Sequence, residues 1–226
     1  MHTPIISVHM PKTAGTTFAD ALAGSVGSAG LSRDYDDRPL HTPLVACRLA
    51  AFKAGLLGAR LDAGRCVHGH FLAYKYRRTL LAGGAFVTWL RDPVERLRSH
   101  YDFWRDRHQP SSSEVTHQRM LDENWSFERF ALGREMRNVY SRCLWRFPLT
   151  NFAFVGITEH FEEDLNAFTK RFSQFSGIPP TPQNQRADHP PRIDRDLRSR
   201  IEHWHAKDMA LYNQALTWRN AGRWRV

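Results

Sequence analysis

Residues 11–17, which read Pro-Lys-Thr-Ala-Gly-Thr-Thr, constrain the fold of this chain more than any other stretch. The run before them, residues 5–10, is apolar and contains β-branched residues, which is typical of a buried parallel strand. Behind them a helical pattern begins at residues 18–22. The order of strand, turn and helix predicts a turn that presents backbone N–H groups at a helix N-terminus.

Such a turn favours a bound anion, because those N–H groups have no partner inside the helix and the helix dipole attracts negative charge. Gly15 lets the backbone come close to a ligand, and Lys12 adds a mobile positive charge. The hydroxyl groups of Thr16 and Thr17 are further donors. A Walker A loop does not fit, because its glycines precede the lysine, whereas Lys12 precedes Gly15. The alternative is a structural turn with a threonine cap and a solvated lysine.

Length and charge narrow the class of protein. The 226 residues suffice for one domain with its own core, and we predict a single domain over residues 1–226. The net charge of +9 suits an anionic nucleotide, a polyanionic glycan, nucleic acid or a membrane surface. Three widely spaced cysteines, without a C-x-x-C pair, predict neither a disulfide framework nor a zinc site. No apolar run approaches the ~18 residues of a membrane span, so we expect a soluble, cytoplasmic protein.

Strand and helix patterns alternate along the rest of the chain. The stretch 24–43 reads as a loop, and its acidic cluster 34–37 is expected to be solvated rather than to bind metal. The stretch 108–123 reads as a mobile insertion, and 178–186 as a proline-rich crossing loop. The alternation implies an α/β fold whose parallel sheet is covered on both faces. The strands are expected near 65–71, 85–90 and 152–157, and helices at 44–57, 93–107, 126–131, 137–146, 159–175 and 194–218.

Three polar stretches each follow a predicted strand: residues 11–17, His68-Gly69-His70, and the run that begins Arg91-Asp92-Pro93. In a parallel sheet, ligands bind beyond the carboxyl ends of the strands. We therefore expect these three stretches to converge on one crevice.

These motifs resemble those of the sulfotransferases that use 3′-phosphoadenosine 5′-phosphosulfate (PAPS). Residues 11–17 look like the loop that binds the 5′-phosphosulfate in that family, and Arg91-Asp92-Pro93 with Ser99 and Tyr101 looks like its 3′-phosphate motif. His-Gly-His is similar to the heparan sulfate 2-O-sulfotransferase branch, among carbohydrate and bacterial members. Later blocks at 125–130, 138–144 and 154–161 are similar in the same order, so the resemblance covers nearly the whole chain. It implies a P-loop-like three-layer α/β/α fold around a central parallel sheet.

The resemblance implies transfer of the sulfuryl group of PAPS to a hydroxyl group, with PAP as the other product and no metal required. The acceptor is expected to be a glycan or another glycoconjugate rather than nucleic acid. An acceptor hydroxyl needs a general base near neutral pH, which we assign to His70, with His68 in support and Lys12 neutralising the migrating group. The residues expected to bind PAPS are Lys12, Thr13, Ala14, Gly15, Thr16, Thr17, Arg91, Ser99 and Arg186.

Several alternatives stay open at the level of sequence. His68 and His70 can be structural, or two ligands of a metal ion, although no third ligand stands at a telling spacing. The whole chain can be a P-loop-like small-molecule kinase or a polyanion-binding module without catalysis. Arg96 and Arg98 are expected to pair with Glu95 and Asp102 on a helix surface. Three residues are expected in the core rather than in an acceptor cleft: His100, Trp104 and Trp125.

Overall fold

The computed structural model describes residues 3–37, 39–40, 43–58, 60–107, 114–175 and 193–224. The strands are β1 (Ile5–Val8), β2 (Leu31–Asp34), β3 (Cys66–Gly69), β4 (Ala85–Leu90) and β5 (Phe152–Ile157). The helices are α1 (Gly15–Gly30), α2 (Leu44–Leu57), α3 (Arg77–Leu81), α4 (Pro93–Asp106), α5 (Val115–Asp122), α6 (Phe127–Ala131), α7 (Val139–Cys143), α8 (Phe161–Arg171), α9 (Arg195–Trp204) and α10 (Ala206–Asn220). Short 3₁₀ turns include η1 (Ala73–Tyr76), η2 (Arg134–Met136), η3 (Leu149–Asn151), η4 (Thr158–His160) and η5 (Ser173–Phe175).

The five strands form one sheet in the order β2-β3-β1-β4-β5, and every neighbouring pair is parallel. The central strand β1 pairs Ile5 with Cys66 of β3 on one side and with Ala85 of β4 on the other. All residues of these three strands are buried, as expected for parallel strands covered on both faces. The predicted α/β class with a parallel sheet is confirmed.

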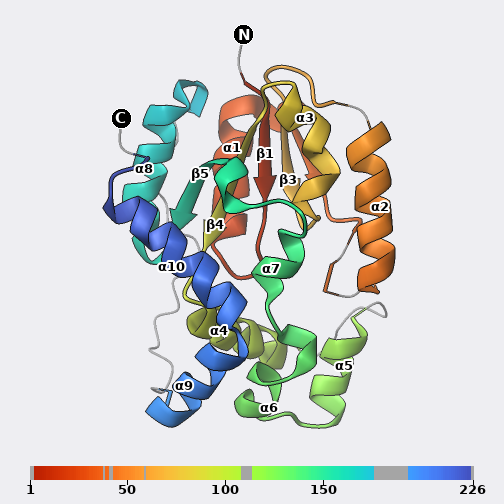
Figure 1. The fold of residues 1–226 in the computed structure, drawn as a ribbon, viewed down its shortest axis with the longest axis vertical. Coiled ribbons are helices and arrows are strands. Elements are labelled where there is room, and N and C mark those ends of the chain that lie inside the picture. The colour runs from red at the N-terminus through yellow and green to blue at the C-terminus, as the bar shows by residue number, and fades with distance from the viewer. Residues whose placement is uncertain are drawn as a thin grey trace.

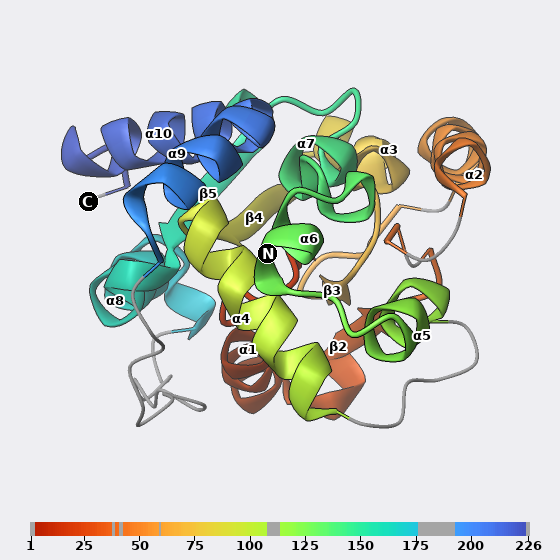
Figure 2. The ribbon, with the colours of Figure 1, turned by 90° about the horizontal axis from the view of Figure 1, so that it is seen from below.

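Helices cover both faces of the sheet and make a three-layer structure (Figures 1 and 2). Helices α1 and α8 lie on one face, where they contact β2 and β5, and helices α3, α7 and α10 lie on the other. Helix α2 lies beside α3 at the outer side of the molecule (Figure 1).

A second group of helices lies beyond the carboxyl ends of the strands (Figure 1). It consists of α4, α5, α6 and α9, which share a separate hydrophobic cluster around Leu97, Phe130 and Ile201. Trp104 and Trp125 belong to this cluster, and His100 is buried against the Trp104 ring. The prediction that these aromatic side chains belong to the core is therefore confirmed.

The stretch 24–43 is not the loop that we expected. Helix α1 continues to Gly30 across a kink at Gly27, and residues 31–34 form the edge strand β2. The expectation that the acidic cluster is solvated is wrong for Asp34, which is buried and accepts hydrogen bonds from Tyr76 Oη at 2.9 Å and Lys75 Nζ at 2.8 Å. Within the described ranges, no group of three or more possible metal ligands occurs.

The predicted insertion at 108–123 contains helix α5, and residues 108–113 lie outside the described residues. The expected helix at 137–146 is shorter, because α7 occupies only Val139–Cys143. The expected final helix is also two helices, which meet at His205. There the buried imidazole donates from Nε2 to the carbonyl oxygen of Ala131 at 2.7 Å and accepts from the N–H of Asn138 at 3.2 Å.

The same histidine makes folding depend on pH. Burial, followed by the charges of nearby arginines, lowers the pKa of His205 to about 4 from its ordinary value of 6.5. The neutral ring leaves Nδ1 able to accept from Asn138. A depressed histidine pKa contributes stability above the unfolded value of 6.5, and that contribution is lost as the pH falls toward 4. We expect the free energy of unfolding to fall by about 2 kcal/mol on account of this residue between about pH 7 and about pH 5.

Urea titrations at the two pH values measure this change. The variant His205→Gln should be less stable at neutral pH and should lose less on acidification than the parent chain. An equal loss in the parent and in the variant would contradict the assignment to His205.

Candidate functional site

The carboxyl ends of β3, β1 and β4 form one edge, here called the carboxyl edge, and all three predicted motifs lie on it. Adjacent strands of a sheet are only about 5 Å apart, so loops that follow neighbouring strands are close in space. The N–H of His9 donates to the carbonyl oxygen of Gly69 at 2.9 Å, and Thr88 Oγ1 donates to that of Val8 at 2.8 Å. The structure thus places Lys12, His70 and Arg91 at the same edge of the sheet.

The loop before α1 is held in an unusual backbone conformation. Lys12 and Ala14 both have positive φ angles, 67° and 59°, in a region that costs free energy for residues other than glycine. The buried Thr13 hydroxyl donates back to the carbonyl oxygen of Met10 at 2.8 Å and helps to hold the turn. Strained backbone of this kind often occurs at binding sites.

The N-terminus of α1 has no side-chain cap, because Ala14 stands at the capping position. Among the described helices, α4, α6 and α9 have side-chain caps, from Asp92, Ser126 and Asp194, whereas α1 shares the lack of one with α2, α3, α5, α7, α8 and α10. An uncapped N-terminus with a positive end of the dipole is suited to hold an external anion. Thr16 is exposed beside it, whereas the Thr17 side chain is buried.

Only glycine fits at position 15, because a neighbouring side chain occupies the space that a Cβ atom would need. A Cβ atom at this position would lie 1.8 Å from Nε2 of His9, a distance that no real contact tolerates. The imidazole of His9 therefore packs directly on the backbone of the loop. The sequence interpretation gave Gly15 the role of admitting a ligand, and the structure adds this contact with the preceding strand end.

His70 is oriented by a backbone carbonyl group. Its Nδ1 lies 2.8 Å from the carbonyl oxygen of His9, and because a carbonyl oxygen only accepts, Nδ1 carries the proton and donates. In the neutral ring, Nε2 then holds the lone pair that can accept a proton. The side chain is only partly buried, so this arrangement suits a general base at the carboxyl edge.

Three imidazole rings form a stack, with His9 in the middle. The centroid of the His9 ring lies 4.3 Å from that of His70 and 4.8 Å from that of His68. Burial, followed by the charges of His70, His68 and Lys12, lowers the pKa of His9 well below its ordinary value. Neutral rings at the centre of the stack avoid like-charge repulsion beside Lys12.

His68 lies deeper than we expected for a residue of the reaction. Its side chain is buried within the sheet, and Nδ1 lies 2.8 Å from the Ser7 hydroxyl. Burial lowers its pKa to about 3, so that the ring is neutral at physiological pH. The rings of His9 and Tyr35 both lie between His68 and His70, since each of them contacts both imidazoles.

Two aromatic side chains that the sequence analysis did not select lie beside the basic residues. The Tyr35 ring meets the His70 ring edge to face at 5.0 Å, and burial raises the pKa of Tyr35. Lys12 Nζ lies 3.9 Å above the centroid of the Phe103 ring, which is 43% exposed on α4. His9 was likewise missed, although its position two residues before the anion loop was a usable signal.

The corner after β4 offers side chains rather than free helix N–H groups. The Asp92 carboxylate already accepts from the N–H groups of Val94 and Glu95, at 2.8 and 3.1 Å, and pairs with Arg198 at 2.6 Å. The backbone of Arg91 is held by the Tyr140 hydroxyl, which accepts from its N–H at 3.1 Å and donates to its carbonyl oxygen at 2.8 Å. The N–H groups at the start of α4 are therefore already engaged by Asp92, so this corner differs from the loop before α1.

The expected pairing of Arg96 and Arg98 on the helix surface is wrong. Arg96 is fully buried, and its guanidinium group lies 5.6 Å from the centroid of the Tyr140 ring without a hydrogen bond to any described residue. Arg98 lies over the Phe127 ring at 4.2 Å, and Glu95 pairs instead with Arg198 at 3.1 Å. Arg186, which was expected to bind PAPS, lies outside the described residues.

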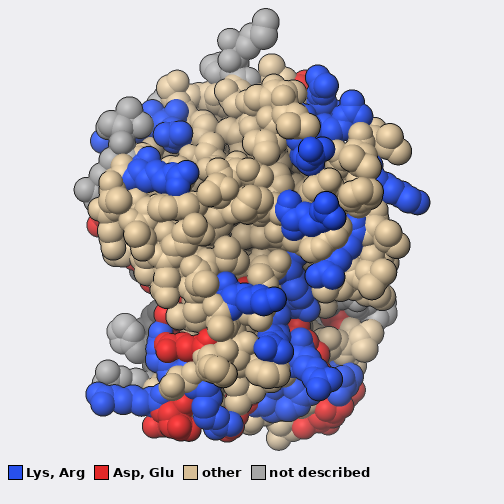
Figure 3. Space-filling view, in the orientation of Figure 1, with Lys and Arg blue, Asp and Glu red and all other residues tan. Residues whose placement is uncertain are grey.

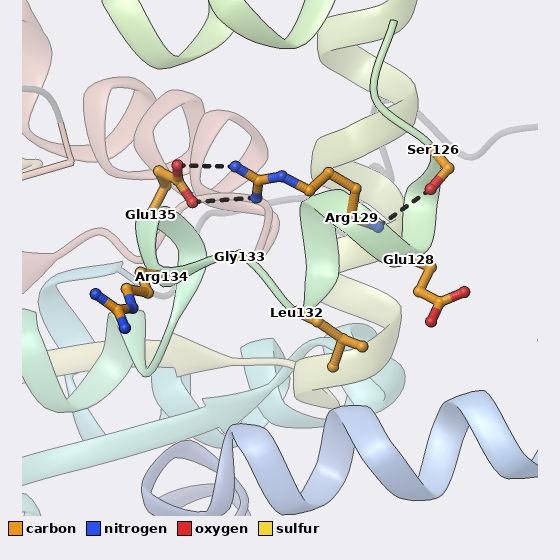
Figure 4. A pocket seen from close by; sticks show the side chains of 7 residues that line it. All are labelled: Ser126, Glu128, Arg129, Leu132, Gly133, Arg134 and Glu135. Carbon is orange, nitrogen blue, oxygen red and sulfur yellow. Dashed lines mark hydrogen bonds and ion pairs between the residues drawn. The ribbon is translucent and has the colours of Figure 1, made fainter. Parts of the chain in front are cut away.

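A pocket of about 570 Å³ opens on α6 and η2, and it contains none of the predicted site residues (Figure 4). Arg129 and Glu135 pair across it at 3.2 Å, so its main charges already satisfy each other. The carboxyl edge, rather than this pocket, therefore remains the candidate site. The lining of the pocket consists of Ser126, Glu128, Arg129, Leu132, Gly133, Arg134 and Glu135.

Comparison with known proteins finds similar solved structures, including two sulfotransferases. No family model matches the sequence, and no curated protein matches it. A sulfotransferase from Alicyclobacillus acidocaldarius is 16% identical, with a TM-score of 0.46 over 97% of this chain and 100% of its own. The mouse sulfotransferase SULT7A1, solved in complex with PAP, is 14% identical, with a TM-score of 0.43 over 90% of this chain and 64% of its own. Similarity this low assigns no role to any residue of this chain.

Proposed function

We propose that this chain is a sulfotransferase that moves the sulfuryl group of PAPS to a hydroxyl group of a carbohydrate. The observation that carries the proposal is the arrangement of the carboxyl edge, where an uncapped helix N-terminus, Lys12 and Arg91 lie beside a histidine of fixed tautomer. A donor with phosphate groups at two ends fits two basic corners that follow neighbouring strands. The sequence resemblance points to the same donor.

The residues of the edge fit PAPS in a simple way. Backbone N–H groups of residues 13–17 and the exposed Thr16 hydroxyl would hold the phosphosulfate end, and Lys12 would neutralise its charge. The side chains of Arg91 and Ser99 would hold the 3′-phosphate, since the helix N-terminus there is occupied by Asp92. A donor without a 3′-phosphate would lose the second group of contacts.

Sulfuryl transfer depends mainly on positioning and electrostatic stabilisation, as phosphoryl transfer does. The acceptor oxygen forms a bond to sulfur while the bond from sulfur to the 5′-phosphate oxygen breaks, and PAP leaves. His70 Nε2 takes the acceptor proton, and the His9 carbonyl group holds Nδ1–H in place throughout. The charge on Lys12 stabilises the negative charge that grows on the leaving phosphate.

The aromatic side chains support a sugar as the acceptor. Tyr35 contacts the base His70, and the partly exposed Phe103 contacts Lys12, so both rings border the place of transfer. Aromatic faces pack well against the C–H faces of sugar rings, while the hydroxyl groups stay available for hydrogen bonds. The two rings can thus orient one hydroxyl toward His70.

Transfer of radiolabelled sulfate from PAPS to a panel of mono- and oligosaccharides tests the proposal. We expect sulfated sugar and PAP in equal amounts, without added divalent metal. Transfer of phosphate from ATP would instead identify a kinase. Binding of polyanions without transfer from either donor would identify a binding module.

The Arg91 side chain should make the protein prefer PAPS over a donor that lacks the 3′-phosphate. Replacing Arg91 with alanine removes a charge-assisted contact to the 3′-phosphate, which is worth about 1.5–3 kcal/mol, and leaves the backbone bonds to Tyr140 in place. We expect KM for PAPS to rise about 10–100-fold with kcat nearly unchanged. KM for adenosine 5′-phosphosulfate, which lacks the 3′-phosphate, should change little. An equal loss with both donors would contradict a 3′-phosphate contact.

A further inference from the structure

Helix α2 is apolar on two opposite sides, and only one of them packs on the protein. Cys47 and Ala51 face inward and form a small buried cluster with Leu72. The opposite side exposes large apolar side chains, and they lie at helical spacing on one face. These are Val45 (68% exposed), Leu49 (58%), Leu56 (44%) and Leu57 (81%). A helix that is apolar on both sides needs a second apolar environment.

The surroundings of this face are basic. Lys53 stands in the middle of the exposed row, and Arg78 lies at its end, where it donates to the carbonyl oxygen of Leu56 at 3.0 Å. Residues 44–61 and 63–91 contain no aspartate or glutamate. In Figure 3 the side that carries α2 and α3 shows blue Lys and Arg atoms with few red ones among them, whereas basic and acidic atoms are mixed on the helices beyond the carboxyl edge.

The combination favours an anionic lipid surface over another protein. Lysine is rare at the centre of protein interfaces, and a twofold contact between two copies would bring Lys53 close to its own equivalent without a counter-charge. At a lipid surface the leucines can enter the acyl boundary while long basic side chains reach up to the phosphates. Lys53 then contacts the lipid phosphates, and the leucines contact the acyl chains.

We propose that α2 is a membrane-docking helix that binds the surface of an anionic bilayer through Leu49, Leu56, Leu57 and Lys53. The helix has 14 residues and lies in the plane of the surface in this arrangement. Throughout the described part of the chain, no helix has the length and apolar character to cross a bilayer. The contact is therefore peripheral and depends on both the leucines and the charge.

Cosedimentation of the full chain with vesicles tests the inference, with phosphatidylcholine alone or with about 30% phosphatidylserine. We expect binding to the anionic vesicles that weakens steeply with salt, and little binding to the neutral ones. The double variant Leu49→Gln/Leu57→Gln should bind at least about tenfold more weakly, and Lys53→Gln about fivefold more weakly.

Val115→Gln is the matched control, because Val115 is exposed to a similar degree (63%) on α5, away from the basic face. All these variants change exposed side chains and should unfold at the parent temperature. Absence of binding to anionic vesicles overturns the inference, as does equal binding to both kinds of vesicle. A dimer in solution that Leu49→Gln/Leu57→Gln converts to monomer also overturns it, in favour of a second copy. Sulfate transfer to a soluble sugar is measured separately and does not depend on the outcome.

Discussion

Replacement of His70 by glutamine will lower kcat by about 10²–10⁴-fold, which is the usual contribution of a general base. Glutamine keeps most of the volume and its amide N–H can still donate to the carbonyl oxygen of His9, but it cannot take up a proton. The binding of PAP, measured by calorimetry, should therefore stay close to that of the parent chain. The loss should appear in kcat rather than in KM.

The pH profile separates a base from a structural histidine. In the parent chain, kcat should fall on the acid side as the base becomes protonated, and this fall should disappear from the small residual rate of His70→Gln. His203→Gln, on the exposed side of α9, is the control and should retain the parent rate and profile. Full activity of His70→Gln with a sulfated product would remove His70 from the mechanism.

The largest loss of stability is expected from Asp208→Ala. This fully buried carboxylate accepts from the N–H groups of Tyr140 and Ser141, each at 3.0 Å, and so joins α10 to α7. Burial raises the pKa of Asp208, while its hydrogen bonds and the charge of the buried Arg96 act against this shift. Its removal leaves the buried N–H of Tyr140 and the partly buried N–H of Ser141 without an acceptor and removes the negative charge that acts on Arg96, which costs about 3–5 kcal/mol.

A loss of this size is a large part of the total stability of a domain, about 5–15 kcal/mol, so the urea midpoint should fall clearly. Asp196→Ala is the matched control, because that carboxylate is exposed and its ion pair with Arg200 is long, at 3.8 Å. Its effect should stay within about 0.5 kcal/mol. Similar midpoints for the two variants would show that the buried carboxylate is not a structural link.

The helices and strands that were predicted correctly from sequence are those whose local sequence pattern matches their burial in the fold. Strands β4 and β5 are uninterrupted apolar runs, and α4 begins with Asp92 and Pro93, a strong helix start. Strand β2 has the sequence Leu-Ser-Arg-Asp with two exposed residues, so nothing in its pattern distinguishes an edge strand from a loop. Its pairing with β3 creates the strand.

In the candidate site, too, residues that stand in sequence motifs were predicted, whereas residues that tertiary contacts bring there were missed. Lys12, His70 and Arg91 stand in motifs, and the parallel sheet alone is enough to bring such motifs to one edge. Tyr35 could not be identified, because it reaches His70 only through the pairing of β2 with β3. Arg96 was misplaced for a related reason, since a charged residue on an amphipathic helix is usually exposed and its burial depends on α7 and α10.

The Arg91 loop, finally, is supported from the far end of the chain. Its backbone is held by the Tyr140 hydroxyl, and the backbone of Tyr140 is held in turn by Asp208 of the last helix. During synthesis the loop leaves the ribosome more than a hundred residues before that support exists. A nascent chain can therefore complete its central strands early and still lack a firm corner for the donor until its final helix has docked.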